Sequence, residues 1–372
     1  MATSRSAEWP KVKFGEVVRK VNKKVDPETS GLERYIAGEH MDTDNLRITR
    51  WGTIGDGYLG PAFTTHFRPG QVLYGSRRTY LRKVVVPDFE GICANTTFVL
   101  ESSSPELLQE FLPHVMSTES FHAFSISRSK GSVNPYINYS DLVDYEFVLP
   151  PVDEQGRIAD LLEAVSRASQ TTGLALELAN QLLCTLAADL TEASGPDVRA
   201  LTDVAQILDS MRVPLNATER AARVGDVPYY GANGQVGTID LPIFNEPLTL
   251  IPEDGGYFSQ WRTEAIAYRI DGPSWVNNHA HVIRAREVPN GWLYFSFRNR
   301  DMTKLIVGTT RTKLNKSALE RLKIAVPANL NERLEILEQS NSLVQILRRH
   351  LNAVDSLKQR VLSDLMDPGE HV

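Results

Sequence analysis

Two copies of one sequence unit follow each other in this chain, and this repeat constrains the fold more than any other feature. Near the end of each copy four positions match at a constant shift of 177 residues: Asn138, Ser140, Leu142 and Pro150 against Asn315, Ser317, Leu319 and Pro327. Two weaker matches precede them in the same order, residues 14–17 against 201–204 and 91–99 against 274–282. An ordered repeat of this kind predicts one topology built twice.

A segment with helical periodicity follows each copy. From 153 to 191, apolar residues recur at spacings of three and four: Ile158, Leu161, Val165, Ala168, Ala175, Ala179, Leu182 and Leu186. From 331 to 366 the series is Ile336, Leu343, Leu347, Val354, Leu357 and Val361. This spacing is typical of coiled-coil helices, and some 40 residues at 1.5 Å each reach roughly 60 Å. We predict that the two helices pack against each other; the alternative is that each packs only on its own globular part.

The globular parts are rich in Val, Ile, Tyr, Phe and Thr between Gly and Pro residues, which favours many short strands. The predicted fold class is therefore α+β, with two pseudo-repeated, β-rich mixed α/β domains, each followed by a long α-helix, and the helices form an antiparallel coiled-coil-like spacer. The expected divisions are a first domain at 1–150, a first helix at 151–193, a second domain at 194–327, a second helix at 328–366 and a tail at 367–372.

Composition excludes several classes of protein. The chain has 372 residues, of which 42% are hydrophobic and 23% charged, as in globular proteins of two or three domains. Its apolar runs are far shorter than the roughly 18 residues that a membrane span needs. The first ten residues are polar, so we expect no export and a cytoplasmic protein. Cys93 and Cys184 are too few for a disulfide framework or a cysteine-rich zinc site, and we expect both to be reduced core residues.

Charge is segregated along the chain, although the net charge is only −6. Residues 67–83 hold five basic residues and no acid, and residues 298–323 hold eight basic residues against two acids. Residues 153–192, by contrast, hold seven acids and two bases. The two basic segments are suited to phosphate contacts at two places; solvated charged faces are the open alternative.

Motif searches point away from catalysis. Residues 55–60 match the glycine spacing of a dinucleotide fingerprint, but Pro61 and a strand-like stretch follow, where that motif needs a helix. His279 and His281 share the spacing of some metal ligands without an evident third ligand, and satisfied polar residues explain them better. The metalloprotease, serine-hydrolase and phosphate-loop motifs are absent from the sequence. We expect neither a catalytic residue nor a metal site in this chain.

Four stretches carry a resemblance to a known family. They are residues 149–155 (LPPVDEQ) before the first helix, 70–83 (GQVLYGSRRTYLRK) in the first copy, and 228–234 (PYYGANG) and 275–282 (WVNNHAHV) in the second. With the repeat and the long helices, they resemble the specificity subunit of a Type I restriction-modification system over nearly the whole chain. The sequence departs from the pattern at 326–332, which has one Pro and lacks the Glu-Gln pair.

This resemblance implies a non-catalytic reader of double-stranded DNA that acts in phage defence. Each domain would be a target recognition domain for one half of a bipartite sequence, and the helices would set the distance between the halves. Two DNA methyltransferase subunits would bind the helices, bring S-adenosylmethionine and modify adenine. Motor-nuclease restriction subunits that use ATP with Mg would join in a restricting complex. The chain itself would carry no cofactor.

Candidate DNA-binding residues follow from charge, aromatic character and amide chemistry. Basic residues suit phosphate contacts or guanine readout: Arg77, Arg78, Arg82, Lys83, Arg311 and Lys313. Tyrosines could stack on bases or bond the backbone: Tyr80, Tyr136, Tyr229 and Tyr230. Asn233 and Gln235 suit the edge of adenine. Asn278 and His279 are further candidates, with the alternative that they and Asn277 satisfy buried backbone groups.

Two rival functions remain open at this point. One is a scaffold or an orphan DNA-binding protein. The other is a self-sufficient DNA methyltransferase, whose catalytic domain would need some 200 further residues, on the order of one more domain.

Overall fold

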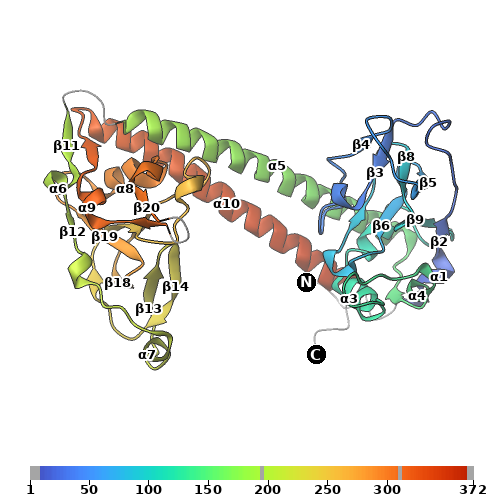
Figure 1. Cartoon of the computed structure of the whole chain (residues 1–372). Coiled ribbons are helices and arrows are strands. Elements are labelled where there is room, and N and C mark those ends of the chain that lie inside the picture. The colour runs from blue at the N-terminus through green and yellow to red at the C-terminus, as the bar shows by residue number, and fades with distance from the viewer. Residues whose placement is uncertain (1–8, 193–196, 309–311, 367–372) are drawn as a thin grey trace. The chain divides into compact units, whose positions relative to one another are not determined.

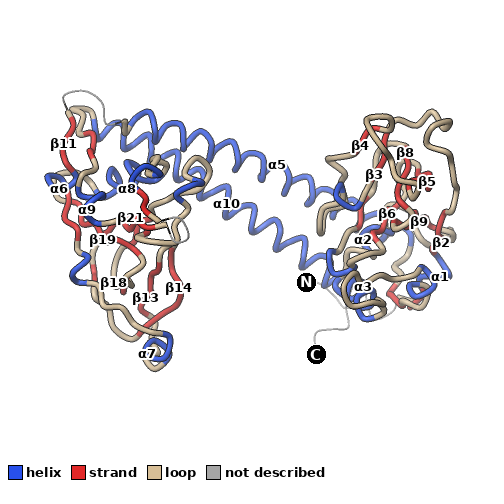
Figure 2. Tube along the Cα trace, viewed as in Figure 1, coloured by secondary structure: helices blue, strands red, loops and turns tan. Residues whose placement is uncertain are grey.

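The computed structural model describes residues 9–192, 197–308 and 312–366 (Figure 1). The chain divides into two compact units, which we call unit 1 (residues 1–170 and 351–372) and unit 2 (residues 171–350). Strands and short helices alternate with loops in both units (Figure 2). No helix in the described ranges combines the length and the apolar character that crossing a bilayer requires.

The described residues of unit 1 form two four-stranded sheets and one strand pair. The first sheet is antiparallel, in the order β2 (Val18–Val21), β9 (Thr97–Ser102), β6 (Val72–Gly75) and β7 (Val84–Val85). The second has the order β4 (Gly52–Thr53), β3 (Arg34–Ile36), β8 (Gly91–Ala94) and β5 (Phe63–Phe67), and its β3–β8 pair is parallel. Strands β1 (Lys11–Lys13) and β10 (Glu146–Val148) pair separately.

Unit 2 repeats both sheets and the strand pair of unit 1, and it has one further strand pair in its described residues. Its first sheet has the order β12 (Ala205–Ile207), β19 (Ala280–Ala285), β16 (Leu248–Pro252) and β17 (Tyr268–Ile270). The second has the order β14 (Gly234–Ile239), β13 (Val227–Gly231), β18 (Pro273–Val276) and β15 (Phe244–Asn245), with β13 and β18 parallel. Strands β11 (Val198–Ala200) and β22 (Lys323–Ala325) pair, as do β20 (Ile306–Val307) and β21 (Lys313–Leu314). The predicted repeat is therefore confirmed as a repeat of topology.

In each unit the first sheet is a middle layer, with helices packed on one face and the second sheet packed on the other. Side chains along its strands alternate between these two faces and so belong to two different cores. On β6, Tyr74 packs with the helices of unit 1, whereas Leu73 packs with Ile36 and Phe67 of the second sheet. On β19, Ile283 packs in the helical core of unit 2 and Val282 packs with the second sheet. Both faces of these strands are buried, which explains their short, almost continuous apolar runs.

Two of the short helices occupy matching places in the two copies. Unit 1 has α1 (Phe14–Val17), α2 (Leu112–Val115), α3 (Glu119–Ser127) and α4 (Tyr139–Leu142). Unit 2 has α6 (Leu201–Val204), α7 (Ala217–Ala221), α8 (Asn290–Arg298) and α9 (Lys316–Glu320). Of these, α1 corresponds to α6, and α4 corresponds to α9. The matched residues Asn138 and Asn315 are the N-cap residues of α4 and α9, a position that favours asparagine.

The two long helices are α5 (Val152–Leu190) and α10 (Leu330–Met366), as their periodicity predicts. In unit 1, Ser169 Oγ donates a hydrogen bond to Asp355 Oδ1 over 2.6 Å, and Leu162 packs in the same core as Leu362. In unit 2, Leu183 of α5 shares a core with Val344 of α10. In both units the helices contact each other and the globular core, so the two alternatives for their packing coexist.

The predicted apolar face of these helices is partly wrong. Leu161 and Leu182 of α5 are exposed and their neighbours Leu162 and Leu183 are buried. On α10, Leu343 is exposed and Val344 is buried, and Ile336 and Leu357 are exposed as well. Adjacent apolar residues give these helices two apolar faces, and periodicity alone does not say which one meets the core.

The motif before the first helix has a local explanation in Gln155, whose side chain is completely buried. Its amide nitrogen Nε2 donates to the carbonyl oxygens of Glu106 and Pro150 over 2.7 Å each, and its Oε1 accepts from the amide of Leu108 over 2.8 Å. This glutamine fixes the start of α5 on the 106–108 segment. The second copy, which lacks the Glu-Gln pair, instead has Arg333 donating from Nη1 to the carbonyl oxygen of Leu190 over 3.0 Å.

Candidate nucleic-acid interface

The candidate site of unit 1 is a loop, residues 76–83, between β6 and β7. A second segment, residues 128–137, lies against it. The backbone amide of Arg78 donates to the carbonyl oxygen of Pro135 over 2.6 Å, and the backbones of Arg77 and Tyr136 form an isolated antiparallel β-bridge. Arg78 Nε also donates to Asn134 Oδ1 over 3.0 Å. Two stretches more than 50 residues apart therefore form one surface, in which the asparagine holds the arginine side chain.

Four predicted residues meet on this surface: Arg77, Arg78, Tyr80 and Tyr136. Both arginines are exposed, and neither pairs with a carboxylate among the described residues. The tyrosines are 52% and 41% exposed, which is high for aromatic rings. Unpaired guanidinium groups beside exposed aromatic rings can bond phosphates and stack on bases.

Arg82 and Lys83 are less available than predicted. The Arg82 side chain is only 24% exposed, pairs with Glu119 and lies 3.6 Å from Asp44 Oδ2. The hydrogen bond to Glu119 raises the pKa of Arg82, and the same contact lowers the pKa of the Glu119 carboxyl. Lys83 Nζ donates to the carbonyl oxygen of Gly38 over 2.5 Å. These two side chains hold the loop in place instead of pointing out from it.

The backbone of this region is strained. Within the described ranges, the non-glycine residues with positive φ are Asp44 at 53°, Arg78 at 52° and Arg82 at 50°. They lie in one region, since the amide of Asp44 donates to the carbonyl oxygen of Arg82 over 3.4 Å. Such conformations cost energy and occur preferentially at functional sites, where surrounding contacts enforce them.

In unit 2, the turn between β13 and β14 carries Asn233, and Gln235 is the second residue of β14. Both side chains are exposed; Asn233 Nδ2 donates to the carbonyl oxygen of Gly255 over 2.9 Å and Gln235 Nε2 to that of Gly237 over 3.1 Å. Their amide oxygens point to no protein donor among the described residues. Gly234 between them has a φ of 127°, which only glycine adopts readily.

The two predicted tyrosines of unit 2 differ. Tyr230 is half-buried and packs on the ring of Tyr268 at 6.1 Å between centroids. Tyr229 is 1% exposed and packs in a small core with Ile239 and Trp275. The proposed stacking role of Tyr229 does not fit this burial, because strand alternation turns its ring to the inner face of β13.

The turn from 277 to 279 joins β18 to β19. Asn277 is buried, and its Oδ1 accepts from the amide of His279 over 2.8 Å, as the backbone-satisfying alternative expected. Asn278 is exposed. His279 is half-buried, and its Nδ1 lies 2.8 Å from Asp254 Oδ1. Of these residues, Asn278 is the one whose side chain is free to reach a ligand.

A buried charge network lies beneath this turn. Arg212 Nη1 donates to Glu253 Oε2 and to the carbonyl oxygen of Ala280, both over 2.8 Å, and its Nη2 lies 3.5 Å from Asp209 Oδ2. Lys313 Nζ pairs with Glu253 Oε1 over 2.8 Å, so this predicted DNA contact is occupied within the protein. Burial raises the pKa of Glu253, but the Lys313 and Arg212 hydrogen bonds outweigh it and leave that pKa lowered. Arg311, the remaining candidate, lies outside the described residues.

The same network contains a grouping that resembles a metal site. Ligand atoms of Asp209, Glu253 and His281 lie within 4.8 Å of one another. His281 is buried, with Nδ1 2.6 Å from Asp209 Oδ2 and Nε2 2.8 Å from the carbonyl oxygen of Leu314. Arg212 already supplies positive charge to both carboxylates. These residues therefore form a satisfied ionic network that needs no cation.

Comparison with known proteins assigns the family. Residues 7–179 and 194–360 each match the sequence profile of the Type I restriction modification DNA specificity domain. The chain belongs to this family.

Individual relatives agree with the assignment. A putative type I restriction enzyme specificity subunit of Haemophilus influenzae is 30% identical over 163 residues, which are 42% of this chain and 40% of that protein. The type I restriction enzyme EcoDI specificity subunit of Escherichia coli is 26% identical over 155 residues, 42% of this chain and 34% of that protein. The chain thus spans less than half the length of the two curated relatives that it matches. A crystal structure of a Type-I restriction-modification system S subunit from M. genitalium shares the fold, with a TM-score of 0.65, 15% identity, and coverage of 98% of this chain and 97% of that one.

Each specificity-domain match contains one full copy of the topology and one candidate interface. The sequence analysis identified Arg77, Arg78, Tyr80 and Tyr136. It missed Asn134, which orients Arg78. It also missed Arg128, an exposed residue whose guanidinium lies over the Phe124 ring at 5.3 Å. The contact of Asn134 with the 76–83 loop joins distant parts of the chain, and nothing local in the sequence signals it.

Proposed function

We propose that this chain is the DNA sequence-specificity subunit of a Type I restriction-modification complex. It binds a bipartite target, with one half read by each unit, and takes no direct part in catalysis. The observation that carries the proposal is the double construction: one topology occurs twice, each copy matches the DNA specificity domain, and each exposes polar side chains of the types that contact DNA.

The two candidate surfaces differ in chemistry. Unit 1 offers guanidinium groups and phenol rings, which suit phosphate oxygens, guanine and stacked bases. Unit 2 offers the amides of Asn233, Gln235 and Asn278, which suit the edge of adenine. Different residues on one scaffold would give the two halves of the target different sequences.

We further propose two DNA methyltransferase subunits as partners, which bring S-adenosylmethionine and methylate adenine. Restriction would add motor-nuclease subunits that use ATP with Mg. The support is the second apolar face of the long helices: within unit 2, Leu174, Leu178 and Leu182 of α5 are exposed at four-residue spacing. Such a stripe on a soluble helix is typical of a protein-binding surface.

The test is to isolate the tagged chain from its native cell, determine the mass of the complex and assay methyl transfer to DNA. We expect two methyltransferase chains per copy, and activity only when both components are present. Mapping the methylated adenines should then give a sequence in two parts separated by unspecified bases. Recovery of the chain alone, without sequence-selective DNA binding, would instead support a scaffold.

A self-sufficient methyltransferase is tested by the same preparation. Methyl transfer by the purified chain without partners would overturn the non-catalytic assignment. Supplying S-adenosylmethionine and target DNA to the chain alone provides this control.

A further inference from the structure

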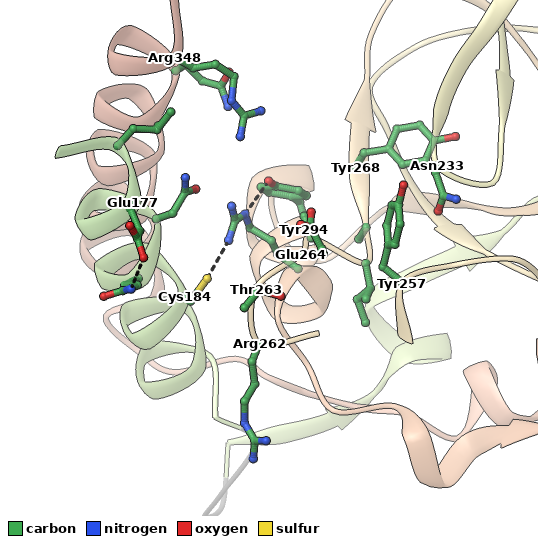
Figure 3. Close-up of a pocket in the computed structure, with 18 of the residues that line it drawn as sticks. Glu177, Cys184, Asn233, Tyr257, Arg262, Thr263, Glu264, Tyr268, Tyr294 and Arg348 are labelled. Carbon is green, nitrogen blue, oxygen red and sulfur yellow. Dashed lines mark hydrogen bonds between the residues drawn. The ribbon is translucent and has the colours of Figure 1, made fainter. Parts of the chain in front are cut away.

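A cleft of about 660 Å³ in unit 2 lies apart from the charge network described above (Figure 3). The helix α5 contributes Glu177 and Cys184 to its lining, α10 contributes Arg348, and the opposite side comes from residues 257–268 and α8. Its volume lies in the range that holds a nucleotide-sized ligand. Cys184, expected in the core, is half-buried in this lining.

Arg298, the last residue of α8, is only 7% exposed and lines this cleft. Its Nε donates to the Tyr294 hydroxyl over 3.0 Å, and its Nη1 donates to Cys184 Sγ over 3.5 Å and to Asn299 Oδ1. All three acceptors are neutral. Nη2 has no hydrogen-bond partner, and the guanidinium has no carboxylate partner, among the described residues. Buried charges in proteins are normally paired, so this arginine lacks a counter-ion.

Two more arginines line the same cleft. Arg262 lies over the Trp261 ring at 4.6 Å, and Arg348 is exposed on α10; neither pairs with a carboxylate within the described ranges. Glu177 and Glu264 also line the cleft but form no ion pair with Arg298. In unit 1, by contrast, the arginine that lines a cleft beside α5 has a carboxylate partner: Arg47 pairs with Glu163.

We infer that this cleft binds the phosphate group of a nucleotide. Arg298 Nη2 would bond a phosphate oxygen, and Arg348 would add charge, since the guanidinium fork matches phosphate geometry; the Arg262 side chain points away from Arg298 (Figure 3). Tyr257, 44% exposed in the lining, offers a flat face for a base. The phosphate could come from a free nucleotide or from a DNA strand, and the experiment distinguishes these sources. The inference goes beyond the proposed function, because a free nucleotide would bind without target DNA.

The test measures binding of adenosine monophosphate and of inorganic phosphate to the full chain by calorimetry and by thermal unfolding. We expect nucleotide binding to raise the unfolding temperature of the native chain, and we expect Arg298→Gln to abolish this rise. Arg348→Gln should weaken binding at least tenfold, in line with the loss of one charge-assisted contact. Arg349→Gln is the matched control, because this neighbouring exposed arginine does not line the cleft. Should Arg298→Gln fail to fold, Arg348→Gln and its control Arg349→Gln carry the test by themselves.

The second arm uses duplex DNA. If neither small probe binds, but Arg348→Gln lowers DNA affinity and the steepness of its salt dependence relative to Arg349→Gln, the phosphate is that of a DNA strand. The inference is overturned if the nucleotide binds all variants equally. It is also overturned if no probe binds and the two arginine variants match in DNA affinity. The nucleotide arm is read without DNA, so its result does not depend on the proposed function.

Discussion

Arg78 is the residue whose geometry is most specific in the candidate interface. Asn134 holds its Nε, its backbone is left-handed, and its two terminal nitrogens have no partner in the described part of the chain. A guanidinium held in this way presents both terminal nitrogens to one ligand, as in bidentate contacts to guanine. Arg82, in contrast, is paired with Glu119 and supports the loop from behind.

We therefore expect Arg78→Lys, which keeps the charge but loses the fork, to relax sequence preference at one position by about 1–3 kcal/mol. The measurement is a set of dissociation constants for duplexes that differ at single positions. Arg78→Ala should weaken binding further. If Arg78→Lys leaves all preferences intact, and Arg78→Ala only lowers the salt slope by about 0.9, Arg78 contacts a phosphate instead.

Two buried histidines of unit 1 make stability depend on pH. Burial lowers the pKa of His114 to about 4, with a smaller contribution from the charge of Lys358. Burial also lowers the pKa of His122 to about 4; nearby Arg82 lowers it further and Glu119 opposes this. Both pKa values lie below the ordinary value of 6.5, so the unfolded chain takes up protons first as the pH falls. Their contribution to stability is complete above pH 6.5 and is lost between about 6.5 and 4.

His114→Gln removes one of these groups. Between pH 7.5 and pH 5, each histidine should account for a loss of about 2 kcal/mol in the free energy of unfolding. Between these two pH values, the free energy of unfolding of the variant should therefore fall by about 2 kcal/mol less than that of the native chain. Urea unfolding at both pH values measures this difference. Parallel pH profiles for the two proteins would contradict this assignment.

At the scale of the element, the long helices have an apolar face that no described residue covers. We expect Leu178→Asp to weaken association with a methyltransferase subunit by at least tenfold, because a charge would enter an apolar contact. Stability of the free chain should change by no more than about 0.5 kcal/mol, since Leu178 is exposed. Co-purification yield and thermal unfolding provide the two measurements.

Gln181→Glu is the control for this variant. It adds a negative charge about one helical turn away on α5 and removes no apolar surface, so association should persist. Equal loss in both variants would mean that charge on α5, and not the leucine stripe, governs assembly. If association persists in both variants, the leucine stripe is not part of the proposed interface.

Elements were more predictable from sequence than the site. The periodicity predicts both long helices almost to their ends. The repeat predicts the double topology, and its matched residues Asn138 and Asn315 stand at the N-cap positions of corresponding helices. The predicted buried face was one residue off at Leu161, Leu182 and Leu343, each of which has an apolar neighbour that is buried instead. Ile158 and Val165, in contrast, are buried as predicted. The site depends on contacts between distant segments, such as Glu119 with Arg82 and Glu253 with Lys313, and local patterns do not encode these.

For the whole molecule, the double construction predicts that the two halves of the target are read independently. Arg78 belongs to unit 1 and Asn233 to unit 2, and they share no partner among the described residues. Arg78→Lys should change the methylated sequence in one half only, and Asn233→Ala in the other half only. Methylation mapping of complexes that carry each variant tests this division.

A double variant with both Arg78→Lys and Asn233→Ala tests the same independence through the free energy of DNA binding. Because the two residues lie in separate compact units, their losses in DNA-binding free energy should add within about 0.5 kcal/mol. Additivity together with two separate altered halves would mean that each unit reads DNA without reference to the other, so that exchanging one unit would exchange half of the specificity. If both single variants altered the same half, the units would instead form one composite reading surface, and the repeat would have a structural role without a division of the target.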